Sequence, residues 1–119
     1  MYFFDTYAII EIIKENKNYA SYKNEIIITS ILNLGELYYS LLKSFNKKTA
    51  DEWKSRLDKS LLLIDTDIIV EAMLFRHNNK NKNFSFIDCV GYILAEKNNL
   101  RFLTGDMEFE GMENVEFVK

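Results

Sequence analysis

Short runs rich in aliphatic, β-branched and aromatic residues alternate along the chain with longer segments in which apolar residues recur at helical spacing. The short runs predict strands at residues 2–5, 26–29, 61–64, 101–104 and 115–118. The longer segments predict helices at residues 6–15, 30–45, 49–59 and 66–77, and one more that begins at Ser85 and ends at Asn98. Residues 16–24 and 78–83 are polar and turn-like.

This alternation is typical of an α/β fold in which helices flank a central, mainly parallel sheet. The chain has 119 residues, of which 48% are hydrophobic, and this is enough for one domain with its own core. It contains no proline and four glycines, so its helices have few intrinsic breakers. We therefore expect residues 1–119 to form a single domain.

The remaining composition indicates a cytoplasmic protein. The single cysteine, Cys89, excludes an intramolecular disulfide, and its place on the apolar side of a predicted helix indicates a buried side chain rather than a reactive thiol. The N-terminus lacks a basic segment and reaches Asp5 too early for a signal peptide. No apolar run approaches the roughly 20 residues that a membrane span requires. The one histidine, His77, is expected to be a solvated cation at a helix end.

The net charge is −3, but basic residues are concentrated in residues 43–59 and 76–82. The plain interpretation is that both segments are solvated surfaces. The alternative is that they are two basic edges on either side of an acidic centre, where they hold a polyanion by its phosphates. The candidates for this role are Lys47, Lys48, Arg76, Lys80 and Lys82.

Four acidic residues occupy conspicuous positions: Asp5, Glu36, Asp88 and Asp106. Each has a purely structural explanation. Asp5 and Asp106 follow predicted strands and are good N-caps. Asp88 lies three residues after Ser85, which is a capping-box pattern. Glu36 falls opposite the apolar stripe of its helix, where it would face water.

As a set, the four carboxylates predict a metal site. The carboxyl ends of parallel strands meet at one crevice, where ligands bind. Mg²⁺ and Mn²⁺ prefer oxygen ligands, and metals held by carboxylates promote phosphodiester hydrolysis by activating water and stabilising the leaving oxygen. Asp88 shares a side of its helix with Gly91 and Ala95, two small residues, so we expect open ground for an ion there.

The segments FFDTYAII, NLGELYYSLL, FSFIDCVGYILA and RFLTGDMEF resemble the PIN-domain family, in order and over essentially the whole chain. In that family the first strand ends in an aspartate followed by Ser or Thr, as in Asp5 and Thr6. A glutamate in a helix after the second strand matches Glu36. An aspartate that opens a later helix rich in small residues matches Asp88.

The last of these segments matches a Thr-x-Asp element that is followed by an acid and Phe, here Thr104, Asp106, Glu108 and Phe109. The sequence departs from the family at Gly105, where a polar or basic residue is often found, and at Cys89, where Ala is common. Neither change removes a ligand.

The resemblance implies a metal-dependent endoribonuclease, and more narrowly the VapC-like toxin of a type II toxin–antitoxin pair. It implies Mg²⁺ or Mn²⁺ as cofactor, held by Asp5, Glu36, Asp88 and Asp106, with Glu108 at the margin. Thr6 and Thr104 are expected to donate hydrogen bonds to these carboxylates.

The resemblance also implies three partners, namely an RNA substrate, a small antitoxin protein and a second copy of the chain. The homodimer has support from the sequence itself. One long helix carries more apolar surface than a single sheet face needs, at Tyr38, Tyr39 and Leu42.

Two other classes of function are consistent with the length and the alternation. In a signalling receiver domain, Asp65 would be the phosphoacceptor at the end of the third strand, but Asp5 stands alone where receivers carry an acidic pair, and no Lys-Pro follows the last strand. In a non-catalytic interaction module, the acids would serve only as helix caps.

Overall fold

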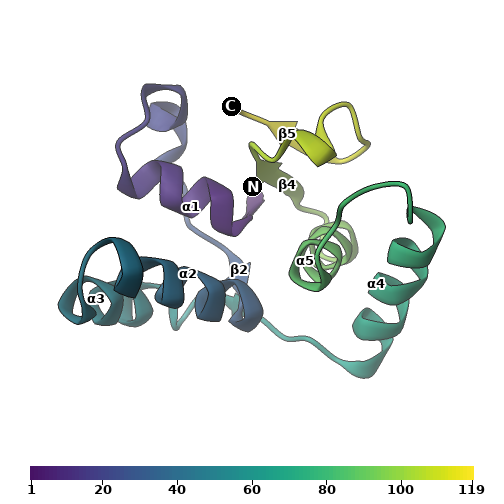
Figure 1. Ribbon diagram of the computed structural model, residues 1–119, viewed down its shortest axis with the longest axis horizontal. Helices are drawn as coiled ribbons and strands as arrows, with labels where there is room; N and C mark the ends of the chain where they lie inside the picture. The colour runs from purple at the N-terminus through teal and green to yellow at the C-terminus, as the bar shows by residue number, and fades with distance from the viewer.

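The computed structural model describes residues 1–119 and has a parallel sheet between two groups of helices (Figure 1). The strands are β1 (Tyr2–Phe4), β2 (Thr29–Ser30), β3 (Leu61–Leu62), β4 (Arg101–Thr104) and β5 (Val115–Phe117). Three of them form a parallel sheet in the order β1-β4-β5, and β2 pairs with β3, also in parallel. A parallel bridge between Phe3 and Ile28 joins this pair to the free side of β1.

Helices connect the strands and cover both faces of the sheet. They are α1 (Thr6–Ile13), α2 (Ile31–Ser44), α3 (Lys47–Leu57), α4 (Thr66–Asn78) and α5 (Phe86–Lys97), with the short 3₁₀ helices η1 (Lys17–Tyr22) and η2 (Met107–Phe109). α1, α2 and α3 lie on one side of the sheet, and α4 and α5 lie on the other (Figure 1).

Side chains that alternate along β1 and β4 create a core on each face of the sheet. Phe3 and Phe102 point to one face and pack in the cluster formed with α5. Phe4 and Leu103 point to the other face and pack with α1 and α2. All four are fully buried, as expected of strands in a parallel sheet with helices on both faces.

Gly91 marks the point where α5 approaches the sheet. A Cβ atom at this position would lie 3.1 Å from ring atoms of both Phe3 and Phe102. Glycine therefore makes room for two aromatic rings, and Ala95 on the same helix is also fully buried. The expectation that these small residues leave open ground for an ion is wrong, because the core fills the space beside them.

The predicted α/β class with a parallel sheet is confirmed, with changes at the ends of elements. The strand predicted at 26–29 is wrong in extent, since Thr29–Ser30 pairs with β3 and Ile28 makes only a bridge. The helix predicted at 49–59 starts earlier because the Asn46 side chain accepts a hydrogen bond from the Thr49 amide and caps it. The polar segment at 16–24 contains η1.

The helix that carries Asp88 forms as predicted. Ser85 and Asp88 make a complete capping box at its start, and Asn98 is its C-cap. Cys89 is a buried free thiol, and His77 is exposed in the last turn of α4. None of the helices combines the length and the apolar character needed to cross a membrane.

Candidate active site

Two of the four acids follow neighbouring parallel strands at the same edge of the sheet. Asp5 directly follows β1, and Asp106 lies two residues after β4. Phe4 pairs with Leu103, so the two chain segments leave the sheet side by side. The Asp5 amide donates to the Leu103 carbonyl oxygen at 3.0 Å, and the Thr104 hydroxyl donates to Asp5 Oδ2 at 2.7 Å. This is the edge at which open α/β sheets bind ligands.

Backbone amides hold both of these carboxylates, as their predicted N-cap roles require. Asp5 Oδ1 accepts a hydrogen bond from the Thr6 amide at 2.9 Å. Asp106 Oδ1 accepts from the Glu108 amide at 3.0 Å, and the Asp106 amide donates to Thr104 Oγ1 at 3.1 Å. The Thr104 hydroxyl is therefore a direct link between Asp5 and the turn that carries Asp106.

The other two acids come from helices on opposite faces of the sheet. Asp88 is half-buried in the first turn of α5, where its Oδ2 accepts a hydrogen bond from the Ser85 amide at 2.8 Å. Glu36 lies in the second turn of α2, and its side chain is exposed, as the helical wheel predicted. α2 and α5 contact each other across the edge of the sheet.

The four carboxylates act on one another electrostatically. Burial raises the pKa of Asp5 from 3.8 to about 7; the Thr104 hydrogen bond opposes the rise, and the negative charges of Asp88 and Glu36 add to it. Burial likewise raises the pKa of Asp88, and the charges of Asp106 and Glu36 add to that rise. Nearby like charges shift a pKa in this way. These charges link Asp5 to Asp88 and Glu36, and link Asp88 to Asp106 and Glu36, and we call the four residues the acidic cluster.

No basic side chain neutralises the acidic cluster. The ion pairs of the protein lie elsewhere, between Lys47 and Asp51, Lys97 and Glu71, and Arg101 and Glu116. Asp5 is only 4% exposed, and a carboxylate in that position normally has a positively charged partner. The cluster is therefore a place where negative charge is concentrated and uncompensated.

Asn33 is a site residue that the sequence analysis missed. It is fully buried in α2, its Nδ2 donates to Thr6 Oγ1 at 3.0 Å, and its Oδ1 accepts from Ser30 Oγ at 2.7 Å. Thr6 donates the predicted hydrogen bond to Asp5 through its backbone amide, while its hydroxyl accepts a hydrogen bond from Asn33. The available signal was a polar residue inside an apolar helix, three positions after its N-cap.

Glu108 connects the acidic cluster to the turn between α4 and α5. Its Oε1 accepts a hydrogen bond from the Asn83 amide at 2.9 Å, and its carbonyl oxygen accepts from Lys82 Nζ at 3.2 Å. The Glu108 carboxylate therefore fixes the turn between α4 and α5 by a hydrogen bond. The Glu108 amide in turn donates a hydrogen bond to Asp106, the N-cap of η2.

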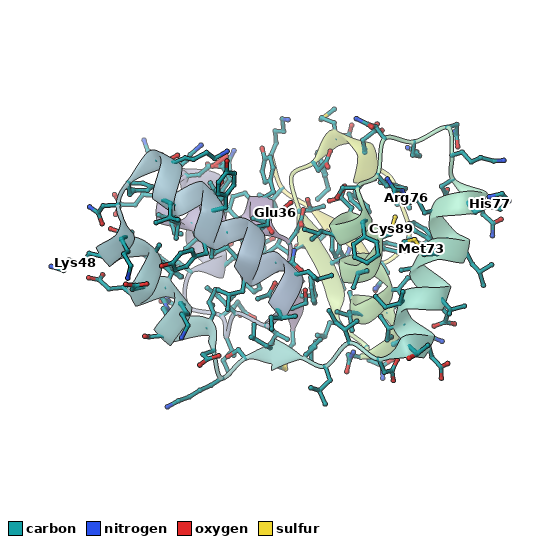
Figure 2. All side chains as sticks on the ribbon, turned by 60° about the horizontal axis from the view of Figure 1, so that its bottom comes forward. Glu36, Lys48, Met73, Arg76, His77 and Cys89 are labelled. Carbon is teal, nitrogen blue, oxygen red and sulfur yellow. The ribbon has the colours of Figure 1, made fainter.

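The two basic segments lie at opposite ends of the molecule. Figure 2 shows Lys48 at one end and His77 at the other, with Glu36 between them and Arg76 on the inner side of α4. Lys47 is paired with Asp51 at 2.7 Å. The arrangement agrees with two basic edges around an acidic centre, and their contact with RNA stays a prediction.

The donor set fits a hard divalent cation, although the side chains are not arranged as a complete site. No three His, Cys, Asp or Glu side chains form a set of metal ligands. Asp88 and Asp106 each direct one oxygen to a backbone amide and keep the other outside any hydrogen bond. Four oxygen donors with uncompensated charge are the chemistry that Mg²⁺ and Mn²⁺ prefer.

Comparison with known proteins identifies the family. The family model described as PIN domain matches residues 2–115, so the chain belongs to the PIN domain family. Asp65 in this fold is an exposed N-cap of α4, whose Oδ1 accepts from the Ile68 amide at 2.9 Å. The family match overturns the receiver-domain alternative, in which Asp65 would be the phosphoacceptor.

Solved structures with the same fold include proteins of toxin–antitoxin systems. The chain is similar to a toxin–antitoxin complex from Klebsiella pneumoniae, at 17% identity and a TM-score of 0.79, over 98% of this chain and 96% of that one. It is similar to Mycobacterium tuberculosis VapC20, described as a sarcin–ricin loop cleaving toxin, at 18% identity and a TM-score of 0.74, over 97% and 98% of the two chains.

A third similar structure is VapBC2 from Rickettsia felis bound to a DNA fragment from their promoter, at 22% identity and a TM-score of 0.68, over 99% of this chain and 98% of that one. At these identities the likeness establishes the fold. A search of curated protein sequences found no match.

Proposed function

We propose that the protein is a metal-dependent endoribonuclease that hydrolyses RNA phosphodiester bonds, as the toxin of a type II toxin–antitoxin pair. The observation that carries this proposal is the acidic cluster, in which the buried Asp5 has other carboxylates and no basic group as its neighbours. Membership of the PIN domain family supports a nuclease.

Asp5, Glu36, Asp88 and Asp106 would hold Mg²⁺ or Mn²⁺, with Glu108 at the margin of the site. When bound, the ion supplies positive charge that acidifies water and offsets the negative charge of the reacting phosphate. The protein would position this chemistry through hydrogen bonds. Thr104 and the Thr6 amide fix the two oxygens of Asp5. Water would attack phosphorus in line, without a covalent intermediate with the protein.

The proposed partners are an antitoxin protein and RNA, and the proposed location is the cytoplasm. The similar structures support the antitoxin, because one is described as a toxin–antitoxin complex and another as VapBC2. The description of VapC20 as a loop-cleaving toxin supports an RNA substrate. Among the candidate basic residues, Lys47 is paired with Asp51, so Lys48, Arg76, Lys80 and Lys82 would hold phosphates on either side of the cleavage point, and binding should weaken with salt.

A homodimer is also part of the proposal. Tyr39, Leu42 and Phe45 are exposed on α2, with 63%, 42% and 52% of their surfaces accessible. Tyr38 is not part of this surface, because its hydroxyl donates to Asp51 at 2.6 Å between α2 and α3. Light scattering at micromolar concentration should give the mass of a dimer, and the mass of a monomer would count against this part.

Cleavage of single-stranded RNA tests the proposed activity. Wild-type protein should cleave with Mn²⁺ and not with EDTA, and Asp5→Asn should abolish cleavage. Asp65→Asn is the matched control, because it removes the same charge from an aspartate that also caps a helix but lies outside the cluster. No cleavage by the wild type with Mn²⁺ present would leave the non-catalytic interaction module as the better account, and retained cleavage in Asp5→Asn would show that the activity does not depend on Asp5.

A further inference from the structure

A surface cavity at the end of α4 is lined by basic side chains. Its volume is about 410 Å³, and its lining includes Arg76, His77, Lys80 and Lys82 but no carboxylate. Two other cavities, of about 420 and 550 Å³, each include at least one acidic residue. The cavity at the end of α4, which we call the basic cavity, is therefore distinguished by the sign of its charge.

The cations of the basic cavity have no acidic partner within the protein. Arg76, Lys80 and Lys82 are absent from the ion pairs, whereas Lys47, Lys97 and Arg101 each pair with a carboxylate. The C-terminus of α4 stabilises cations in its last turn, but Lys80 and Lys82 lie beyond the helix. Several unpaired cations around one hollow favour an anionic ligand.

The basic cavity shares a wall with the acidic cluster. Lys82 and Asn83 line the cavity and also donate hydrogen bonds to Glu108, at 3.2 and 2.9 Å. Arg76, which also lines the cavity, and Asp88 both act by their charges on the buried Cys89, and Figure 2 shows Arg76 beside Cys89. A strand of RNA that crosses the acidic cluster would therefore meet the basic cavity next.

We propose that the basic cavity is a phosphate subsite for single-stranded RNA, which holds a backbone phosphate next to the one that is cleaved. This inference rests on the proposed function. The Arg76 guanidinium suits bidentate contact with a phosphate, and Lys80 adds a second positive charge. The cavity has the volume of a small-ligand site, so it can hold a nucleotide as well as its phosphate.

An acidic peptide would also suit the charge of the cavity, but the position favours RNA. Two residues of the cavity donate hydrogen bonds to Glu108, at the margin of the acidic cluster, so a phosphate held in the cavity would direct the next phosphate of the strand toward the cluster. An acidic peptide has no phosphodiester, so proximity to the acidic cluster would not favour its binding.

The test measures binding of a single-stranded oligoribonucleotide in EDTA, where no cleavage occurs. Lys80→Ala should weaken binding about tenfold, and it should reduce the slope of log K against log salt by about 0.7. Arg76→Ala should act in the same direction. Lys59→Ala is the matched control, because Lys59 is exposed just before β3, at the edge of the parallel sheet opposite the acidic cluster. Lys59→Ala should change neither quantity.

Equal weakening by Lys80→Ala and Lys59→Ala would overturn the subsite, because it would show only the effect of net charge. Unchanged binding in Lys80→Ala, with normal cleavage by the wild type, would overturn the subsite and leave the proposed function intact. Binding that depends on Lys80, without cleavage by the wild type, would support the subsite and overturn the nuclease. If a poly-glutamate peptide binds more tightly than RNA, and its binding is weakened by Lys80→Ala, the proposal that the cavity binds RNA would be overturned.

Discussion

Two hydrogen-bonded aspartates have pKa values shifted in opposite directions: Asp51, between α2 and α3, and Asp5, at the edge of the sheet. Asp51 accepts hydrogen bonds from Lys47 at 2.7 Å and from Tyr38 at 2.6 Å, and these partners lower its pKa. Asp5 also accepts two hydrogen bonds, from the Thr6 amide and the Thr104 hydroxyl, yet burial raises its pKa to about 7.

The difference lies first in burial and then in the charge of the neighbours, rather than in the number of hydrogen bonds. Asp51 has an ammonium partner at the surface, whereas Asp5 is buried near Asp88 and Glu36 with no cation. A fold gains nothing from a buried carboxylate whose neighbours repel it. Buried carboxylates with a raised pKa are concentrated at functional sites. The comparison therefore indicates that Asp51 has a structural role and Asp5 a functional one.

After the loss of cleavage in Asp5→Asn, the largest expected effect is on activity, at Glu36. This side chain is exposed and is dispensable if it only faces water, but its charge reaches both Asp5 and Asp88. Glu36→Gln should lower the rate of RNA cleavage by about a hundredfold or more. Glu52→Gln, a change of an exposed glutamate on α3, should leave the rate unchanged. Equal rates in the two variants would remove Glu36 from the site.

The second effect is a pH dependence of stability in the metal-free protein. The pKa of Asp5 is 3.8 when unfolded and about 7 when folded, so between these values the unfolded chain releases a proton that the folded protein retains. The free energy of unfolding should therefore fall as pH rises from about 4 to 7, by at most about 1.4 kcal/mol per pH unit from this group.

Urea denaturation of the wild type and Asp5→Asn in EDTA measures this contribution as a difference between the two proteins. Asp5→Asn lacks the titrating group, so its advantage in stability should grow over the same pH range. A constant difference between the two proteins would show that the pKa of Asp5 is not raised.

A smaller effect is expected from the threonine that holds Asp5. Thr104→Val removes the hydroxyl that bonds to Asp5 and Asp106, and should cost about 1–3 kcal/mol of stability and roughly tenfold in activity. Thr29→Val is the matched control, because its buried hydroxyl donates to the Phe4 carbonyl oxygen at 2.8 Å and touches no acid. Both should destabilise the protein, but only Thr104→Val should raise the pKa of Asp5, as measured by NMR titration.

The smallest effect is expected at the paired aspartate. Lys47→Ala removes the surface partner of Asp51, and exposed ion pairs of this kind contribute little to stability. Its melting temperature and its cleavage rate should both stay close to those of the wild type. A large loss of activity would mean that Lys47 contacts RNA despite its pairing with Asp51. The Lys47–Asp51 pair would then have a functional role as well as a structural one.

The positions of the acids at element ends were predictable from the sequence, because strand ends and capping patterns are local signals. Asp5 after a strand and Asp88 in a capping box are read directly from neighbouring residues. The parallel sheet followed from the alternation of strands and helices. These features depend on a few adjacent residues and hardly at all on distant packing.

Tertiary packing decided what the sequence did not predict. Gly91 looked like space for an ion, but Phe3 and Phe102 from two different strands fill that space. Asn33 donates a hydrogen bond to Thr6, which is 27 residues away in sequence, and the local position of Asn33 three residues after the N-cap does not indicate that contact. The basic cavity likewise arises only when the turn after α4 is tied to Glu108, which lies 25 residues away in sequence from Asn83.

The most direct test of the central claim is the melting temperature of the protein with and without Mn²⁺. If the acidic cluster binds a divalent cation, Mn²⁺ should raise the melting temperature of the wild type and of Asp65→Asn by similar amounts, because a ligand that binds only the folded state stabilises it. Asp5→Asn should show little or no rise. An equal rise in Asp5→Asn, or no rise in the wild type, would contradict the account.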